Sequence, residues 1–313
     1  MNFAKTVSLS SRVILKERHA KPLVAQRKST NNIIPFLFIA PSLLFFISFS
    51  YFPFIRTIIT SFTMTDAAGQ FKSWVGFNNF THIFKRPDFS TIIINTLKFA
   101  SAVAVSSLLI GFALALFANM KIKGFSRVNE LLFSMPLAIA SASAAIVWGI
   151  ILQPQIGALN YILGANINWL QNPVWAFFSV TLVTVWLQMA VNFIFLLTGL
   201  RVIPQELMES AKIDGAAGIN KFFRITLSLV SPTLFFVIFF NAMASFQAFG
   251  QIRLLTAGGP GIATRVLVYD IYLEAFMNYR FGTACAQSLI LFAIMFLFTL
   301  IQFKFEDKGV HYS

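Results

Sequence analysis

The sequence is poor in charged residues. Asp, Glu, Lys and Arg make up only 11% of its 313 residues, whereas hydrophobic residues make up 57%. Because soluble globular domains contain about 25% charged residues, this composition excludes an ordinary soluble protein and favours an integral membrane protein. Uncharged apolar runs of the length needed to cross a bilayer, about 20 residues, recur from residue 33 to near the C-terminus.

Groups that usually carry chemistry are also scarce. Cys285 is the only cysteine, so no internal disulfide can form, and His19, His82 and His311 are isolated in the sequence. This pattern is unfavourable for a metal site or a histidine-based catalytic set. The sequence has no G-x-x-x-x-G-K-[ST] loop to hold ATP. It also has no carboxylate inside an apolar run, where ion-coupled carriers usually need one. We expect no catalytic residue, metal or cofactor in this chain, and an external source of energy.

The apolar runs predict an all-α membrane protein with six transmembrane helices, because long runs without alternation exclude a closed barrel. The expected spans cover about residues 33–55, 99–120, 131–152, 175–198, 227–249 and 283–303. The chain divides into a basic tail (1–32), a six-helix transmembrane domain (33–305) with a loop at 199–226 between the fourth and fifth spans, and a C-terminal tail (306–313).

The distribution of Lys and Arg predicts the orientation. Sixteen of them lie in the tail 1–32, in segments 118–130 and 199–226 and in the C-terminal stretch from Lys304 onward, whereas seven lie in 54–90 and 250–282. Short cytoplasmic segments retain positive charge, so both termini and the loop at 199–226 are expected in the cytoplasm. Membrane topology thus explains the net charge of +13 more simply than nucleic-acid binding does.

The spans carry neutral polar side chains in stripes. In the fourth span, Thr184, Gln188 and Asn192 are four residues apart and share one helix face, and Asn241 lies in the fifth span. Uncharged hydrogen-bonding groups suit a path for a hydroxylated solute. The alternative is that they only tie helices together.

The loop at 199–226 contains one short amphipathic segment. Residues 204–213 predict a helix that ends at Asp214-Gly215. Ala211 and Gly215 are four residues apart, and Glu209 and Asp214 flank them, which predicts a smooth docking surface for another protein. The alternative is a helix that rests on the membrane surface.

The same loop resembles a known family. Glu209-Ser210-Ala211, three residues, Gly215, nine residues and Ile225-x-Leu227 are similar to the cytoplasmic EAA loop of binding-protein-dependent ABC importer permeases, although Ser228 stands where that pattern has a proline. LLTAGGPGIATRVLVYDIYLEAF, from Leu254, resembles the outer loop of the carbohydrate-type branch. VWLQMAVNFIFLL and CAQSLILF are most similar to permeases for glycerol-3-phosphate, with sugar importers close behind.

The resemblance implies a bacterial-type inner-membrane subunit that works with a second permease, an ATPase dimer that binds ATP and Mg, and an extracytoplasmic solute-binding protein. It implies that the helix from Glu209 to Gly215 docks on the ATPase. It also implies that the turn at Gly258, Gly259 and Pro260 lies near the binding protein, although a merely rigid turn between spans explains these residues equally well.

The residues leave several other functions open. A secondary carrier or channel without an ATPase, for a small polar solute, is the main alternative, and an ionisable residue at mid-membrane would favour it. A membrane-embedded enzyme would need a nucleophile or an acid–base pair near the interface. A scaffold role would leave the polar stripe without a purpose. For a phosphate-bearing solute, Arg253, Arg265 and Arg280 are the cations on the expected outer side, where the binding protein or lipid headgroups could also use them.

Overall fold

The computed structural model describes residues 34–120, 126–215 and 218–309, and these residues are mostly helical. The chain forms two compact units, residues 1–53 and 54–313. The predicted tail 1–32 and the last four residues of the predicted tail 306–313 lie outside the described residues.

The first unit contains the first predicted span. It comprises α2 (Ile34–Phe46), the π-helical turn η1 (Ile47–Tyr51) and the start of α3 (Phe52–Ser61). Its side chains from Phe36 to Pro53 are exposed. Pro41 lies inside α2, where the missing N–H opens one hydrogen bond of the helix. The apolar helix Phe36–Ser61 is long enough to cross a membrane.

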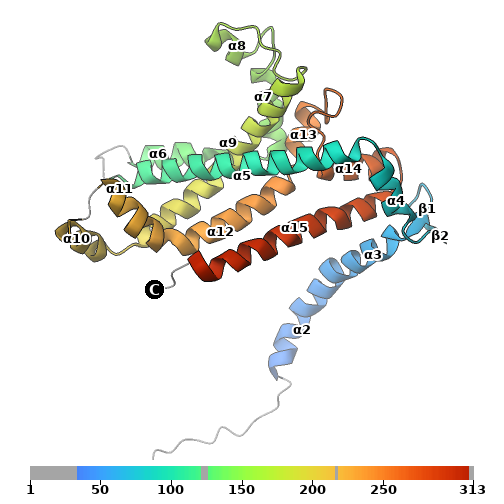
Figure 1. The fold of residues 1–313 in the computed structure, drawn as a ribbon, viewed down its shortest axis with the longest axis horizontal. Helices are drawn as coiled ribbons and strands as arrows, with labels where there is room; N and C mark the ends of the chain where they lie inside the picture. The colour runs from blue at the N-terminus through green and yellow to red at the C-terminus, as the bar shows by residue number, and fades with distance from the viewer. Residues whose placement is uncertain (1–33, 121–125, 216–217, 310–313) are drawn as a thin grey trace, which may run out of the picture. The chain divides into compact units, whose positions relative to one another are not determined.

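The second unit holds every other element (Figure 1). In chain order these are β1 (Thr63–Thr65), β2 (Phe71–Trp74), α4 (Asn78–Lys85), α5 (Phe89–Asn119), α6 (Ser126–Ser134), the 3-10 turn η2 (Met135–Ala138), α7 (Ser141–Ile151), α8 (Ala158–Leu163), α9 (Pro173–Val202), α10 (Gln205–Ile213), α11 (Gly218–Lys221), the π-helical turn η3 (Phe222–Thr226), α12 (Leu227–Phe246), α13 (Gly250–Leu255), α14 (Leu267–Tyr272), the π-helical turn η4 (Leu273–Met277) and α15 (Phe281–Gly309). Strands β1 and β2 pair antiparallel.

Long helices form the body of this unit. Helix α5 packs along α9, α12 packs against both, and α15 packs against α12. Glycines permit the closest approaches: a Cβ on Gly111 of α5 would lie 2.7 Å from Cβ of Asn192 in α9, and a Cβ on Gly199 of α9 would lie 2.7 Å from the hydroxyl oxygen of Thr233 in α12. Small residues at helix crossings are typical of membrane bundles.

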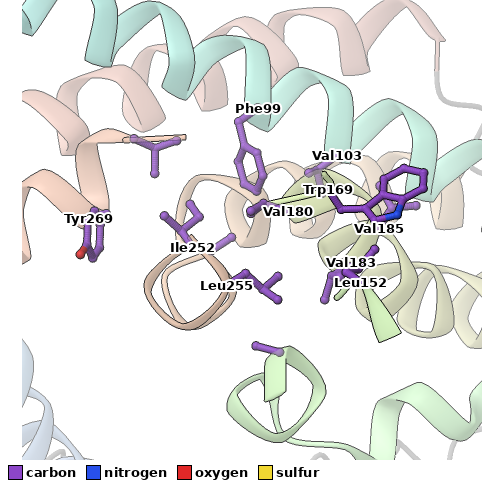
Figure 2. Close-up of a cluster of buried hydrophobic side chains, with 13 residues drawn as sticks. Phe99, Val103, Leu152, Trp169, Val180, Val183, Val185, Ile252, Leu255 and Tyr269 are labelled. Atoms are coloured by element: carbon purple, nitrogen blue, oxygen red, sulfur yellow. The ribbon is translucent and has the colours of Figure 1, made fainter. Parts of the chain in front are cut away.

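One apolar core fixes the short segments that follow the long helices (Figure 2). It joins Phe99 and Val103 of α5 and Val183 of α9 to Ile252 of α13 and Tyr269 of α14, all of them buried. Helix α13 also packs against α7. The segments between α12 and α15 are therefore anchored by buried side chains and held in a defined position.

The third predicted span, 131–152, is wrong as a single straight helix. Helix α6 ends at Ser134, and α6 and α7 meet at an angle of 104°. Pro136 has no N–H to bond to the carbonyl of Leu132, and its ring would clash with that carbonyl in a continuous helix. The chain becomes extended at residues 139–140 before α7 begins.

The remaining spans agree with the prediction. Within the described residues, five helices are long and apolar enough to cross a membrane, and the bent α6–α7 pair makes a sixth only if it counts as one span. Helix α5 begins ten residues before the predicted start at Phe99, because the segment before Lys98 also continues the helical pattern. The described part of the fold is therefore mostly helical, as predicted, with five candidate spans and one bent pair, and it also contains the short β1–β2 hairpin that the prediction lacked.

Candidate functional site

Two of the four polar side chains predicted to line a path, Asn192 and Asn241, meet in one buried network. Oγ of Ser107 in α5 lies 3.0 Å from Oδ1 of Asn241 in α12 and accepts a hydrogen bond of 3.2 Å from Nδ2 of Asn192 in α9. Nδ2 of Asn241 donates to the carbonyl of Ala104 at 2.7 Å. These contacts join three long helices, and Ser107 is a member of the network that the sequence analysis missed.

The four predicted path residues have different surroundings. Asn192 and Asn241 are only 1% and 2% exposed, so their amides tie helices together in this single chain. The hydroxyl of Thr184 donates to the carbonyl of Val180 within its own helix at 2.8 Å. Gln188 is half-buried and accepts a 3.0 Å hydrogen bond from Ser245 of α12. Gln188 is thus the member of the set that reaches the surface of the bundle.

Helix α10 lies where the sequence predicts an amphipathic helix, between α9 and α12. Glu209, Asp214 and Gly215 are exposed, and Gly215 has φ +80° with open space around it, as expected at a helix end. Ala211 is different from the expectation, because it is only 7% exposed. It shares the covered face of α10 with the half-buried Met208, one turn earlier.

The free face of α10 therefore differs from the predicted patch. It presents Glu206, Glu209 and Ile213, and Ile213 is 87% exposed. Beside α10 lies a cavity of about 620 Å³ whose lining includes Met208, Lys221 and also Glu209, so Glu209 lies at the border between the free face and this cavity. Nζ of Lys221 donates to the carbonyl of Met208 at 3.4 Å. Ile213 follows Glu206 and Glu209 on the same face of the helix, so this face is open to contact with another protein.

The turn at Gly258, Gly259 and Pro260 is tightly closed. The hydroxyl of Thr264 donates to the carbonyl of Gly259 at 2.9 Å and lies 2.7 Å from the hydroxyl of Thr256. Gly258 has φ +80°, and a Cβ there would lie 2.8 Å from the ring of Tyr269, so only glycine fits. Gly259 and Pro260 are half-buried, which leaves a rigid turn with a partly accessible tip.

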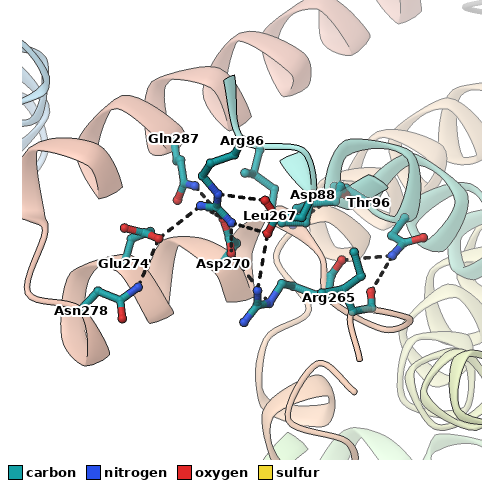
Figure 3. Close-up of polar contacts among 12 residues, drawn as sticks. Arg86, Asp88, Thr96, Arg265, Leu267, Asp270, Glu274, Asn278 and Gln287 are labelled. Carbon is teal, nitrogen blue, oxygen red and sulfur yellow. Dashed lines mark hydrogen bonds and ion pairs between the residues drawn. The ribbon is translucent and has the colours of Figure 1, made fainter. Parts of the chain in front are cut away.

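A buried cluster of charges lies where α4, α5, α14 and α15 meet (Figure 3). The guanidinium of Arg86 forms ion pairs with Asp88 at 2.7 Å, Asp270 at 3.1 Å and Glu274 at 3.2 Å. Nε2 of Gln287 in α15 donates to Asp270 at 2.6 Å. Asp270 and Glu274 are almost fully buried, and a buried carboxylate needs such partners. We call Arg86, Asp88, Asp270, Glu274 and Gln287 the Arg86 cluster.

The electrostatics of the cluster follow from these contacts. The hydrogen bonds from Arg86 hold the pKa of Asp88 below its usual value, and Arg265 adds to the effect from 3.8 Å. The hydrogen bond to Asp88 raises the pKa of Arg86, although burial opposes this. The sequence analysis missed the cluster. A usable signal was present, because Asp270 and Glu274 are four residues apart in an otherwise apolar segment.

Comparison with known proteins gives consistent results. The profile of the family described as "Binding-protein-dependent transport system inner membrane component" matches residues 107–308. The sn-glycerol-3-phosphate transport system permease protein of Brucella abortus is 36% identical over 287 residues, which cover 90% of this chain and 98% of that protein. The corresponding protein of Yersinia enterocolitica is 35% identical over 284 residues, with 90% and 96% covered.

Solved structures show the same fold. A chain of a bacterial ABC transporter involved in the import of the acidic polysaccharide alginate superposes with a TM-score of 0.78 at 22% identity, over 88% of this chain and 95% of that chain. A chain of the alginate transporter in complex with a pentasaccharide-bound periplasmic protein gives a TM-score of 0.76 at 22% identity, over 87% and 93%. A chain of the MetNI methionine transporter gives 0.54 at 13% identity, over 71% and 96%.

Proposed function

Since the chain belongs to the family of inner-membrane components of binding-protein-dependent transport systems, we propose that it is a permease subunit of an ATP-driven ABC importer. The imported solute is a sugar or a molecule like glycerol-3-phosphate. The permease itself has no catalytic role, and a separate ATPase subunit binds ATP and Mg. The relatives named for sn-glycerol-3-phosphate transport support this solute class, because the match extends over nearly their whole length.

The observation that carries the proposal is the free face of α10. This helix follows one long helix and precedes another, its Ala211 side is covered, and its opposite side presents Glu206, Glu209 and Ile213. The ATPase takes Ile213 into an apolar groove, and the two carboxylates precede it on the same face. Gly215 lets the chain turn directly after the helix. ATP-driven closure of the ATPase dimer moves α10, and through it the bundle.

The topology follows from the same assignment. The α6–α7 pair counts as one broken span, which gives six spans, and irregular backbone at membrane depth is tolerated where other protein covers it. Helix α10 and both termini face the cytoplasm, as the charge distribution favours. The opposite end then meets the solute-binding protein, and the half-buried tip at Gly259 and Pro260 is one of its contacts.

The solute path runs along the face of the bundle that faces a second, similar permease. Gln188 is its best candidate in this chain, because it is half-buried and bonded to Ser245. Asn192, Asn241 and Thr184 support this surface from behind with their hydrogen bonds. Uncharged groups of this kind can replace water around a hydroxylated solute without trapping it.

The test is a substitution on α10. The tagged chain, expressed with its natural partners, should co-purify with an ATPase and a second, similar permease. Ile213→Glu should reduce the recovered ATPase roughly tenfold or more, because burying an isoleucine contributes about 1.5–3 kcal/mol and each 1.4 kcal/mol is a factor of ten. The second permease should remain bound. Ile213 gives a cleaner test than Gly215, whose positive φ strains any side chain placed there.

A matched control is available on α8. Ile162 is 76% exposed, so Ile162→Glu adds the same charge without touching α10 and should retain the ATPase. Normal ATPase recovery with Ile213→Glu would exclude docking through this face and leave the importer assignment intact. Recovery of the wild-type chain alone, with transport independent of ATP, would reject the importer and favour a secondary carrier or channel.

A further inference from the structure

One cation at the α14 side of the bundle is held without a carboxylate. The guanidinium of Arg253 in α13 lies 4.7 Å from the ring centre of Tyr272 and 5.9 Å from that of Phe249. The Arg253 side chain is exposed and has no ion pair with any described residue. Arginine stacked on aromatic faces keeps the N–H groups at its edge available for an anion.

The other cations nearby are arranged differently. Arg86 is committed to the three carboxylates of its cluster, and Arg265 lies 3.8 Å from both Asp88 and Asp270. Arg280 is exposed and forms no ion pair with a described residue. Unlike that of Arg253, its guanidinium is not stacked on any described aromatic ring. Of these four arginines, Arg253 alone is both free of carboxylates and held in a fixed place.

The position of Arg253 is set by its helix. Ile252 and Leu255 of α13 are buried in the core that Figure 2 shows. A Cβ on Gly250 would lie 3.0 Å from the hydroxyl oxygen of Ser141, so α13 also lies close against α7. The buried side of α13 is therefore anchored, and Arg253 projects from its free side onto the ring of Tyr272.

Tyr272 belongs to a row of aromatic rings. Its ring centre lies 5.0 Å from that of Phe249, 6.0 Å from that of Tyr269 and 5.5 Å from that of Phe276. Tyr269 is only 5% exposed, whereas Phe276 is 59% exposed, so the ring of Phe276 offers an apolar contact to a solute beside Arg253. The guanidinium at one point of this row adds a charged contact.

Arg253 follows the polar path residues in the sequence. Asn241 and Ser245 are four residues apart on α12, which ends at Phe246, and Arg253 lies in the next helix, α13, after a break at residues 247–249. Ser245 carries the hydrogen bond to Gln188. The contact with Gln188 and the free side of α13 are thus only eight residues apart along the chain.

We propose that Arg253, held over the rings of Tyr272 and Phe249, binds the phosphate or carboxylate group of an anionic solute as it enters the path from the α14 side. This inference rests on the proposed importer function and narrows its solute to an anionic one. A guanidinium can donate two parallel hydrogen bonds to two oxygens of either group, a two-point contact. The solute then moves on toward the half-buried Gln188.

The test uses the complete importer, reconstituted with its second permease, ATPase and binding protein in vesicles of phosphatidylcholine. Two rates are measured: ATP-dependent uptake of radiolabelled sn-glycerol-3-phosphate, and ATP hydrolysis stimulated by the binding protein. With Arg253→Gln, uptake per ATP hydrolysed should fall roughly tenfold or more, since a hydrogen bond to a charged group contributes about 1.5–3 kcal/mol. Stimulated hydrolysis should be retained. Arg253→Lys should be intermediate, and the control Arg280→Gln should match the wild type.

Each other outcome overturns the proposal in a distinct way. Unchanged uptake with Arg253→Gln, or an equal loss with Arg280→Gln, would exclude a specific contact. Loss of the stimulated hydrolysis would show that Arg253 docks the binding protein. A defect seen only after phosphatidylglycerol is added would identify a lipid headgroup as the anion. If the wild type takes up maltose but not glycerol-3-phosphate, the importer function is retained and the proposal of an anionic solute is refuted. If the wild type takes up neither, the importer function fails and the inference fails with it.

Discussion

The two ends of the helical bundle in the second unit are stabilised in different ways. At the α14 end, the Arg86 cluster is buried and joins four helices through ion pairs and hydrogen bonds. At the α10 end, the charged pair between Arg201 and Glu130 is partly exposed to solvent. That end also contains the cavity of about 620 Å³ beside α10.

The difference indicates that one end of the bundle is rigid and the other can move. A buried network of charges has few alternative arrangements, because any unpaired member is costly. A short helix over a cavity, with an exposed face, can shift with little loss of contacts. The α14 end is thus suited to hold a fixed geometry for an incoming solute, and the α10 end to follow the movement of a partner.

Removal of the central cation should have the largest effect. Arg86→Met would leave the buried Glu274 without its counter-charge and Asp270 with only the more distant Arg265 at 3.8 Å, so we expect a loss of about 3–5 kcal/mol in the free energy of unfolding. Thermal unfolding in detergent would measure it. Lys85→Met is the matched control, because Lys85 is an exposed cation next to Arg86, and it should unfold like the wild type. Equal melting temperatures for Arg86→Met and the wild type would contradict a stabilising role for the cluster.

Acid should weaken the same end. The pKa of Asp88 is lowered in the folded protein, chiefly by the hydrogen bonds from Arg86. Its stabilising contribution is therefore fully present above the unfolded pKa, about 4, and is lost as the pH falls below that value. The window set by that pKa runs from roughly pH 5 to pH 3. Over this window, the melting temperature of Asp88→Asn should fall by less than that of the wild type.

The control for the acid experiment lies at the other end. Asp214 is exposed beside α10, so Asp214→Asn should show the same acid-induced loss as the wild type. If Asp88→Asn and Asp214→Asn respond identically to acid, the acid sensitivity does not originate in the Arg86 cluster.

The sequence predicted the parts of this fold that depend on long local patterns. Apolar runs located the long helices, and the periodicity and the Asp214-Gly215 stop located α10. The break at Pro136 could have been read from the proline, but an uncharged apolar run on both sides favoured a continuous helix. Which face of α10 is covered depends on neighbours that are distant in the sequence. Ala211 was therefore assigned to a free patch although it is buried.

The site shows the same limit. The stripe of Thr184, Gln188 and Asn192 was visible as a helical spacing, and the structure brings Gln188 and Asn192 together with Asn241 through Ser245 and Ser107. Whether these side chains line a path or only join helices depends on a partner surface, so the lining role stays a prediction. In the Arg86 cluster, the directly paired residues Arg86 and Glu274 are 188 positions apart, and no local pattern records such pairing.

The smallest effect is expected at the α10 end. Arg201 and Glu130 form an ion pair, but their side chains are 48% and 27% exposed, so water screens the attraction. Arg201→Gln should change the free energy of unfolding by only about 0.2–1 kcal/mol, and added salt should reduce the difference further. Parallel unfolding measurements at low and high salt would test this. A loss comparable to that of Arg86→Met would mean that the α10 end is also fixed by its charges, and the proposed division between a rigid and a movable end would not hold.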